Sequence, residues 1–422
     1  DVQPVNTEKK GIGKKIALLM STIGPGLFLI GYNIGTGSIT TMASAGSRYG
    51  MSLFWTLVFS CLFTYVMMIA YGHYTAVTGE TALNAYRKHF RFGRTLAIYT
   101  MISLIIGELT ALAGIMGILT DLIGEWCRFT LGIQVSALWT AVVIIIGCFL
   151  LLWDGKYSHF EIFLTVLVII MGVGFLGSML LVVPSPGDLL AGLKPQIPDE
   201  PDAFLIVAGM AGTTCSAMVF IMRSIVVAEK GWKRDAIKKE KVDAFFSSFM
   251  MMLLSASVMA CAAGTLFKMG RPVEQTIDMV QTLEPLAGRF AISIFVLGVI
   301  GAAISTLFPI VLVAPWLISD YTGKPRQIRS TMYRVLGGAG LLIGLTVPVF
   351  GGRPVWVMVG SQAFQAMILP VITLPIIYLL NRRDLMGQDK AGFWMNLGLW
   401  ATFIFAMVTA YTGLVGLLEM IG

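Results

Sequence analysis

The chain has 422 residues, of which 56% are hydrophobic and 13% are charged, whereas an average soluble domain carries about 25% charged residues. This composition, together with a mean hydropathy of +0.82, excludes a soluble enzyme, a disordered chain and a disulfide scaffold. The formal net charge of +7 would suit a nucleic-acid-binding protein, so the position of the charges has to be examined.

Apolar stretches of 18 or more residues recur along nearly the whole chain, and each can cross a hydrocarbon layer about 30 Å thick. We therefore predict an all-α, polytopic membrane protein with eleven transmembrane helices and no soluble domain. A polar tail at residues 1–15, without a cleavable signal peptide, is expected before the first helix. In chain order the predicted spans are residues 16–45, 51–77, 96–124, 136–153, 160–183, 203–228, 242–268, 288–319, 332–350, 354–380 and 392–418.

The basic residues lie mostly on one side of these spans. If the N-terminus and every second connection share a side, that side holds 23 of the 30 Lys and Arg residues. The positive-inside rule then predicts a cytoplasmic N-terminus, an extracytoplasmic C-terminus and a place in the plasma (inner) membrane. The positive charge is therefore a topology signal, and no nucleic-acid partner is expected.

Little in the sequence indicates catalysis or a bound cofactor. The five cysteines have no metal-ligand spacing, and the three histidines lie in different parts of the chain. No nucleophile–base pair or phosphate-binding loop is found. We expect a monomer without a cofactor that is not an enzyme, whose partners are a small-molecule solute and the lipid bilayer.

Two spans contain segments that make poor continuous helices. In the first span, Gly35 and Gly37 flank a threonine, and in the sixth, Gly209 and Gly212 precede a hydroxyl-rich run at 213–218. A membrane helix can unwind only where protein or a cavity satisfies the freed backbone groups. Broken helices one and six predict two inverted repeats of five helices, residues 16–183 and 203–380, followed by one extra helix at 392–418, with a substrate site at mid-membrane. Close packing through small residues is the alternative explanation.

Few polar side chains are expected at membrane depth. Glu108 is the clearest carboxylate inside a span, and such a group is a functional hypothesis by default because its burial costs at least a few kcal/mol. Gln362 and Gln365 on the tenth span, with Thr306 and Ser305 on the eighth, could face the same cavity or bond neighbouring helices.

Three parts of the chain resemble the Nramp superfamily of divalent-metal transporters. They are Gly-Pro-Gly at 24–26 with Gly-Tyr at 31–32, Thr-Gly-Glu-Thr-Ala-Leu at 78–83, and Ser361-Gln362 with Arg-Arg-Asp-Leu-Met-Gly at 382–387. The resemblance runs from residue 24 to about residue 387. It implies the LeuT-like fold, alternating access, and a site between helices one and six.

The chain departs from the family where the family binds metal. The family's Asp-Pro-Gly-Asn on helix one falls on residues 35–38, and its Met-Pro-His on helix six falls on residues 216–218. The second histidine of helix six falls on Arg223, and of the Asp-x-x-Glu pair on helix three only Glu108 remains. Gln362 matches a family glutamine near the metal. These losses make transition-metal transport unexpected, because Mn²⁺ and Fe²⁺ prefer carboxylate, imidazole and softer sulfur ligands.

Two substrates fit the remaining residues. A neutral sugar or polyol would use the mixed donors and acceptors, and the small glycines would make room for it. The alternative is Mg²⁺, or another hard divalent cation, that keeps most of its hydration water. The predicted substrate-binding residues are Asn33, Gly35, Thr36, Gly37, Ser38, Glu108, Thr213, Thr214, Ser216, Met218 and Gln362.

Overall fold

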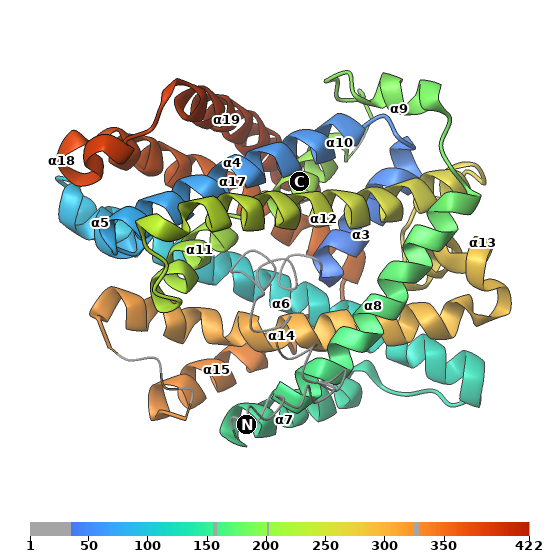
Figure 1. Cartoon of the computed structure of the whole chain (residues 1–422). Helices are drawn as coiled ribbons and strands as arrows, with labels where there is room; N and C mark the ends of the chain where they lie inside the picture. The colour runs from blue at the N-terminus through green and yellow to red at the C-terminus, as the bar shows by residue number, and fades with distance from the viewer. Residues whose placement is uncertain (1–34, 155–157, 201, 325–326, 328, 422) are drawn as a thin grey trace, which may run out of the picture.

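The computed structural model describes residues 35–154, 158–200, 202–324, 327 and 329–421, and the part it describes is built from helices and connecting turns (Figure 1). The longer helices are α3 Thr36–Tyr49, α4 Phe54–Thr78, α5 Ala82–His89, α6 Gly93–Leu131, α7 Ala137–Asp154, α8 Ser158–Leu181, α10 Ala203–Thr214, α11 Ala217–Glu229, α12 Ile237–Ala262, α14 Ala291–Thr322, α15 Thr331–Ile343, α17 Pro354–Asn381 and α19 Phe393–Ile421. The shorter elements are α9 Pro186–Gly192, η1 Arg234–Ala236, η2 Ala263–Phe267, η3 Thr276–Leu283, α13 Glu284–Ala287, η4 Gly288–Phe290, α16 Thr346–Phe350, α18 Arg383–Met386 and η5 Gly387–Asp389.

The predicted spans correspond closely to these helices. Among the described residues, eight helices are long and apolar enough to cross a membrane, or nine if α8 and α9, bent by 114°, form one span. The predicted total of eleven is not confirmed. The first predicted span lies largely outside the described residues, and α7 contributes only a shorter apolar helix.

The first predicted break is partly corrected. Thr36, Gly37 and Ser38 form the first turn of α3 instead of an unwound stretch, and Gly35 is the extended residue before it, with φ −104° and ψ −168°. The first-turn N–H groups of a helix lack partners within the helix. This helix therefore begins inside the protein, at the position where the sequence predicts an interruption. The tail at 1–15 and Asn33 lie outside the described residues.

The break in the sixth span is confirmed and is two residues long. Helix α10 ends at Thr214 and α11 begins at Ala217, with Cys215 and Ser216 in non-helical conformations between them. These two helices are the most deeply buried of the candidate spans, with 94% of their most apolar stretch inside the protein. The carboxyl end of α10 and the amino end of α11 therefore meet in the interior.

Helix α17 packs against α10, α6 and α19. It lies so close to α10 that a methyl group on Gly212 would come 1.8 Å from the carbonyl oxygen of Gln362. Only a residue without a side chain allows this approach. The sequence analysis gave close packing as the alternative explanation for the small residues. At Gly212, beside the break, the structure shows such packing.

We expect Gly212→Ala to lower the stability of the protein by about 1–3 kcal/mol, because the backbone oxygen cannot move aside cheaply. The measurement is the thermal midpoint of the purified protein in detergent. Gly147→Ala in α7 is the matched control, because a methyl group there meets nothing within 4 Å. Equal midpoints for the two variants would contradict the packing argument.

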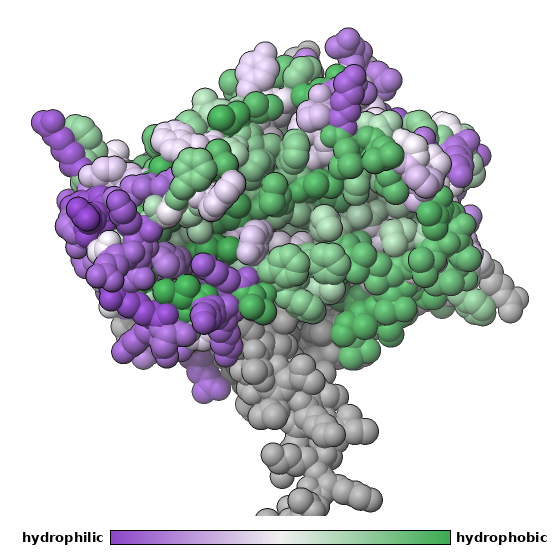
Figure 2. Space-filling model, turned by 45° about the horizontal axis from the view of Figure 1, so that its top comes forward, coloured by the Kyte–Doolittle hydropathy of each residue, from purple (hydrophilic) through white to green (hydrophobic). Residues whose placement is uncertain are grey.

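The surface carries the pattern of a membrane protein. Figure 2 shows apolar side chains across the middle of the face and polar side chains gathered toward its edges. Large apolar side chains remain exposed on α7 and α19, among them Trp139, Val143 and Ile404, each at least 64% exposed. Such a surface is stable in lipid and would aggregate in water.

The segment 78–83, which the sequence analysis singled out, joins α4 to α5 through a polar network. Glu80 accepts a hydrogen bond from the Tyr74 hydroxyl at 3.0 Å and contacts Lys88 Nζ at 2.9 Å and His89 Nε2 at 2.8 Å. Burial alone would raise the pKa of Glu80, but the hydrogen bonds from Lys88, His89 and Tyr74 outweigh it and hold that pKa below its ordinary value. This motif therefore fixes a connection between helices.

Candidate functional site

A cavity of about 30 Å³ lies where the break between α10 and α11 faces α3, α6, α14 and α17. Thr213 and Ser216 come from the two sides of the break, and Gly35 and Gly37 come from the start of α3. The other lining residues are Glu108, Ala111, Ile115, Thr306, Ile310, Gln362 and Gln365. Segments that are far apart in the sequence therefore meet around one small interior space.

Glu108 is the acidic side chain of this cavity. Its side chain lies on α6 and is 3% exposed. Burying a carboxylate at this depth is costly, so a group of this kind indicates function more than packing. It is the only carboxylate among the described residues that line the cavity.

The remaining polar groups are hydroxyls and amides. Ser216 Oγ donates to Gln365 Oε1 at 3.1 Å, which joins the helix break to α17. The Thr306 hydroxyl donates to the backbone oxygen of Ala302 at 2.7 Å, so its lone pairs remain able to accept or coordinate. The polar side chains that line the cavity therefore offer oxygen atoms as acceptors or ligands, and the two glutamine side chains add amide nitrogens as hydrogen-bond donors.

The two glycines of α3 set the size of the cavity. A methyl group on Gly35 would lie 2.5 Å from Thr306 Oγ1, and one on Gly37 would lie 2.9 Å from Gln362 Nε2. Any side chain at these positions would occupy the cavity or displace its polar lining. The sequence analysis expected these glycines to make room for a sugar or polyol, but the space that they leave is only on the scale of one methyl group.

Six of the eleven predicted site residues line the cavity, and four described ones do not. Ser38 Oγ lies 3.1 Å from Ser255 Oγ on α12, the backbone oxygen of Thr214 accepts from the Thr64 hydroxyl, and Met218 is fully buried on α11. Thr36 is buried beside Gly35 and is not a lining residue. The reason is helical geometry, because successive residues of a helix are rotated by about 100° and point toward different neighbours.

The buried hydroxyls of Thr36 and Thr214 nevertheless have no hydrogen-bond partner among the described residues. Buried polar groups are nearly always paired, so such atoms need an explanation. Both residues lie next to cavity-lining residues in the chain.

Five lining residues were absent from the predicted set. Thr306 and Gln365 were recognised as polar residues that could face the cavity, and the structure places both there. The apolar lining by Ala111, Ile115 and Ile310 had no sequence signal, because apolar residues occur at every depth of every span.

Arg223, at the position of the family's second helix-six histidine, is part of a buried ionic cluster. It is fully buried, and its guanidinium contacts Glu240 Oε1 at 2.8 Å and Asp243 Oδ2 at 2.6 Å on α12. It also donates to the backbone oxygen of Glu240 at 3.2 Å. We refer to these three residues as the Arg223 cluster. It clamps α11 to α12 and contributes no residue to the cavity lining.

The described residues contain no group of three or more His, Cys, Asp or Glu side chains that could hold a metal ion. Taken together, the fold and cavity define a multi-pass helical membrane protein whose interrupted sixth span opens onto a small polar site.

Comparison with known proteins identifies the family. Residues 26–416 match the family described as Natural resistance-associated macrophage protein-like, Nramp, and the chain belongs to it. The protein is therefore a membrane transporter and not an enzyme, as the sequence analysis predicted.

Proteins of several bacteria are similar to this chain in sequence. The chain is 23% identical over 402 residues to the divalent metal cation transporter MntH of Nostoc sp., covering 92% of this chain and 88% of that protein. It is 25% identical over 386 residues to MntH of Pectobacterium carotovorum, covering 89% and 90%.

Solved structures confirm the fold. A manganese transporter of Eremococcus coleocola matches with a TM-score of 0.72 at 16% identity, over 97% of this chain and 88% of that chain. MhsT, solved in complex with L-phenylalanine, matches with a TM-score of 0.61 at 12% identity, over 94% of this chain and 98% of that chain. The LeuT-like fold that the resemblance implied is thereby confirmed.

Proposed function

We propose that this protein is a secondary transporter for a hard divalent cation, which it holds through oxygen atoms at the cavity between α3 and the α10–α11 break. The observation that carries the proposal is the lining itself. It combines one buried carboxylate with oxygen-bearing side chains and has no imidazole or sulfur among the described lining residues.

The chemistry of the donors favours a hard ion. Mg²⁺ and Ca²⁺ are bound by carboxylate, carbonyl, amide and water oxygens, whereas softer metals are selected by thiolate, thioether and imidazole. Glu108 supplies the negative charge. Helix dipoles do not decide the sign of the ligand, because the carboxyl end of α10 and the amino ends of α11 and α3 all lie at the cavity. Mg²⁺ dehydrates reluctantly and usually keeps several waters, so the cavity of about 30 Å³, which has room for about one or two waters, would have to widen to hold the hydrated ion.

The sugar or polyol that the sequence favoured is not supported. The relatives are named as divalent-metal or manganese transporters. The cavity of about 30 Å³ is also far below the roughly 300–1,000 Å³ of sites that hold organic ligands. A sugar would require the helices to separate around it, and it remains one outcome of the experiment below.

The fold supports a proposal for how the ion is transported. We propose alternating access, with α10, α11 and the start of α3 closing on the ion, in a chain built from the repeats 16–183 and 203–380 with one added helix, and functioning as a monomer. The distribution of Lys and Arg supports a plasma-membrane protein with its N-terminus in the cytoplasm and its C-terminus outside.

The first test is thermal stabilisation of the purified protein by Mg²⁺, Ca²⁺, Mn²⁺ and a panel of sugars. A ligand at 100 times its Kd raises the free energy of unfolding by about 2.7 kcal/mol if it binds only the folded state. We expect Mg²⁺ or Ca²⁺ to raise the thermal midpoint and sugars to leave it unchanged. A shift with one sugar and none with the cations would overturn the proposed substrate.

A further inference from the structure

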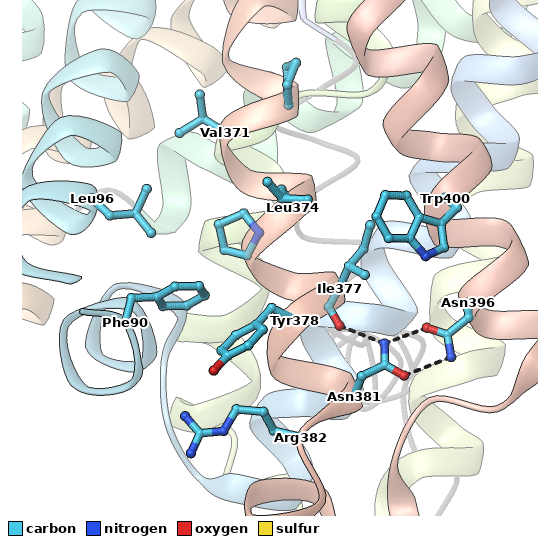
Figure 3. Close-up of a pocket in the computed structure, with 12 residues that line it drawn as sticks. Phe90, Leu96, Val371, Leu374, Ile377, Tyr378, Asn381, Arg382, Asn396 and Trp400 are labelled. Atoms are coloured by element: carbon cyan, nitrogen blue, oxygen red, sulfur yellow. Dashed lines mark hydrogen bonds between the residues drawn. The ribbon is translucent and has the colours of Figure 1, made fainter. Parts of the chain in front are cut away.

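A groove of about 930 Å³, separate from the cavity, runs along α17 between the start of α6 and the start of α19 (Figure 3). Its floor is the stretch of α17 from Pro370 to Arg382. Phe90 and Leu96 lie along one side and Trp400 lies along the other, with Leu374 and Ile377 between them (Figure 3). The groove is thus a long, mainly apolar trough on the outer side of the helices.

The groove has the length of one membrane leaflet. Twelve residues of helix, from 370 to 381, rise about 18 Å at 1.5 Å per residue. Half of a hydrocarbon core about 30 Å thick is about 15 Å. An extended acyl chain from one leaflet therefore fits beside α17 along the full length of the groove.

Polar groups occur at one end of the groove only. Asn381 and Asn396 exchange two side-chain hydrogen bonds, of 2.6 and 3.0 Å, and Arg382 follows at the end of α17 (Figure 3). Tyr378, 49% exposed, stands near this end (Figure 3), as aromatic side chains do at a membrane interface. An apolar trough with a polar end matches an amphiphile with a single headgroup.

The charge at the polar end favours an anionic headgroup. Arg382 donates to Asp384 through Nε and Nη2 and to the backbone oxygen of His89 through Nη1. A guanidinium has five N–H donors, which exceeds these three described bonds. The adjoining segment 87–94 carries four Lys and Arg residues and no acid, and segment 382–390 carries three against two acids. Basic clusters at membrane level attract anionic lipid.

We propose that this groove is a binding site for an anionic glycerophospholipid, with one acyl chain along α17 and the phosphate at Arg382. A protein helix is a poorer occupant. It is about 10–12 Å wide, so it would also cover the polar end of the groove, where the Asn381–Asn396 pair offers it no apolar contact. The proposal depends on the membrane-spanning fold and not on the identity of the transported solute.

The test is native mass spectrometry of the full-length protein released from nanodiscs of phosphatidylcholine and phosphatidylglycerol. We expect retained phosphatidylglycerol on the unmodified protein. Leu374→Trp, which places a bulky ring across the groove, should lower that retention by about tenfold. Arg382→Gln should lower it by about fivefold. Ile404→Trp is the matched control, because Ile404 is an exposed apolar residue of α19 outside the groove.

Three results would overturn the proposal. The first is equal retention of phosphatidylcholine and phosphatidylglycerol, and the second is unchanged retention in both groove variants. The third is a dimer, or a complex with another protein, that is lost in Leu374→Trp. If Leu374→Trp fails to fold, Val371→Trp fills the same groove, and the Arg382→Gln comparison stands by itself.

Discussion

Glu108→Gln is expected to weaken cation-dependent stabilisation strongly while leaving the fold intact. Glutamine keeps the size and one oxygen of the side chain but removes its charge, and Glu108 is the only carboxylate among the described residues lining the cavity. Hydrogen bonds to charged groups contribute about 1.5–3 kcal/mol, so the loss corresponds to about a 10- to 100-fold weaker Kd. Isothermal titration with Mg²⁺ and Ca²⁺ measures it.

Glu125→Gln provides the control on the same helix. Glu125 is 26% exposed and pairs with Arg128 at 3.0 Å, so its loss should leave the cation Kd unchanged. For a neutral sugar, Glu108→Gln should weaken binding only moderately, since an amide still accepts a hydrogen bond. Unchanged cation affinity in Glu108→Gln would show that the cation site lies elsewhere.

Arg223→Gln is expected to destabilise the protein by about 3–5 kcal/mol, because removing one partner of a buried ionic cluster leaves its counter-charges uncompensated. Glu240 and Asp243 are 0% and 8% exposed and would face each other without a cation between them. The measurement is the thermal midpoint of unfolding, which should fall strongly because the ion pairs between α11 and α12 are lost.

Two comparisons separate this effect from a general loss of charge. Arg234→Gln removes an exposed arginine that contacts Asp389 at 3.1 Å and should cost less than about 1 kcal/mol. Adding Glu240→Gln to Arg223→Gln should restore part of the lost stability, because the two positions share one cluster. If Arg223→Gln and Arg234→Gln have equal midpoints, the cluster does not stabilise the packing of α11.

Much of the fold could be predicted from the sequence because the bilayer imposes simple requirements. Long apolar runs become helices, and the predicted 354–380 and 203–228 match Pro354–Asn381 and Ala203–Glu229 within a residue. The short connectors were not predicted. Helix α5 is an example, because eight residues with a narrow apolar side give too weak a periodic signal.

The site was predicted in part. Glycine and hydroxyl residues in an apolar run indicated where helix six breaks, and the break falls at Cys215 and Ser216. Which hydroxyl faces the cavity depends on the rotation of each helix, so Ser38 was predicted in the site although it lies against Ser255. Thr306 could be recognised as polar, but its partner helices could not be known before the structure.

Mg²⁺ uptake into proteoliposomes, followed with an enclosed indicator, tests the proposed function most directly. The account predicts uptake by the unmodified protein and by Glu125→Gln, strongly reduced uptake by Glu108→Gln, and none by empty liposomes. Radiolabelled sugars should not accumulate. Uptake of a sugar without Mg²⁺ uptake, or Mg²⁺ uptake that Glu108→Gln leaves unchanged, would contradict a cation site at this cavity.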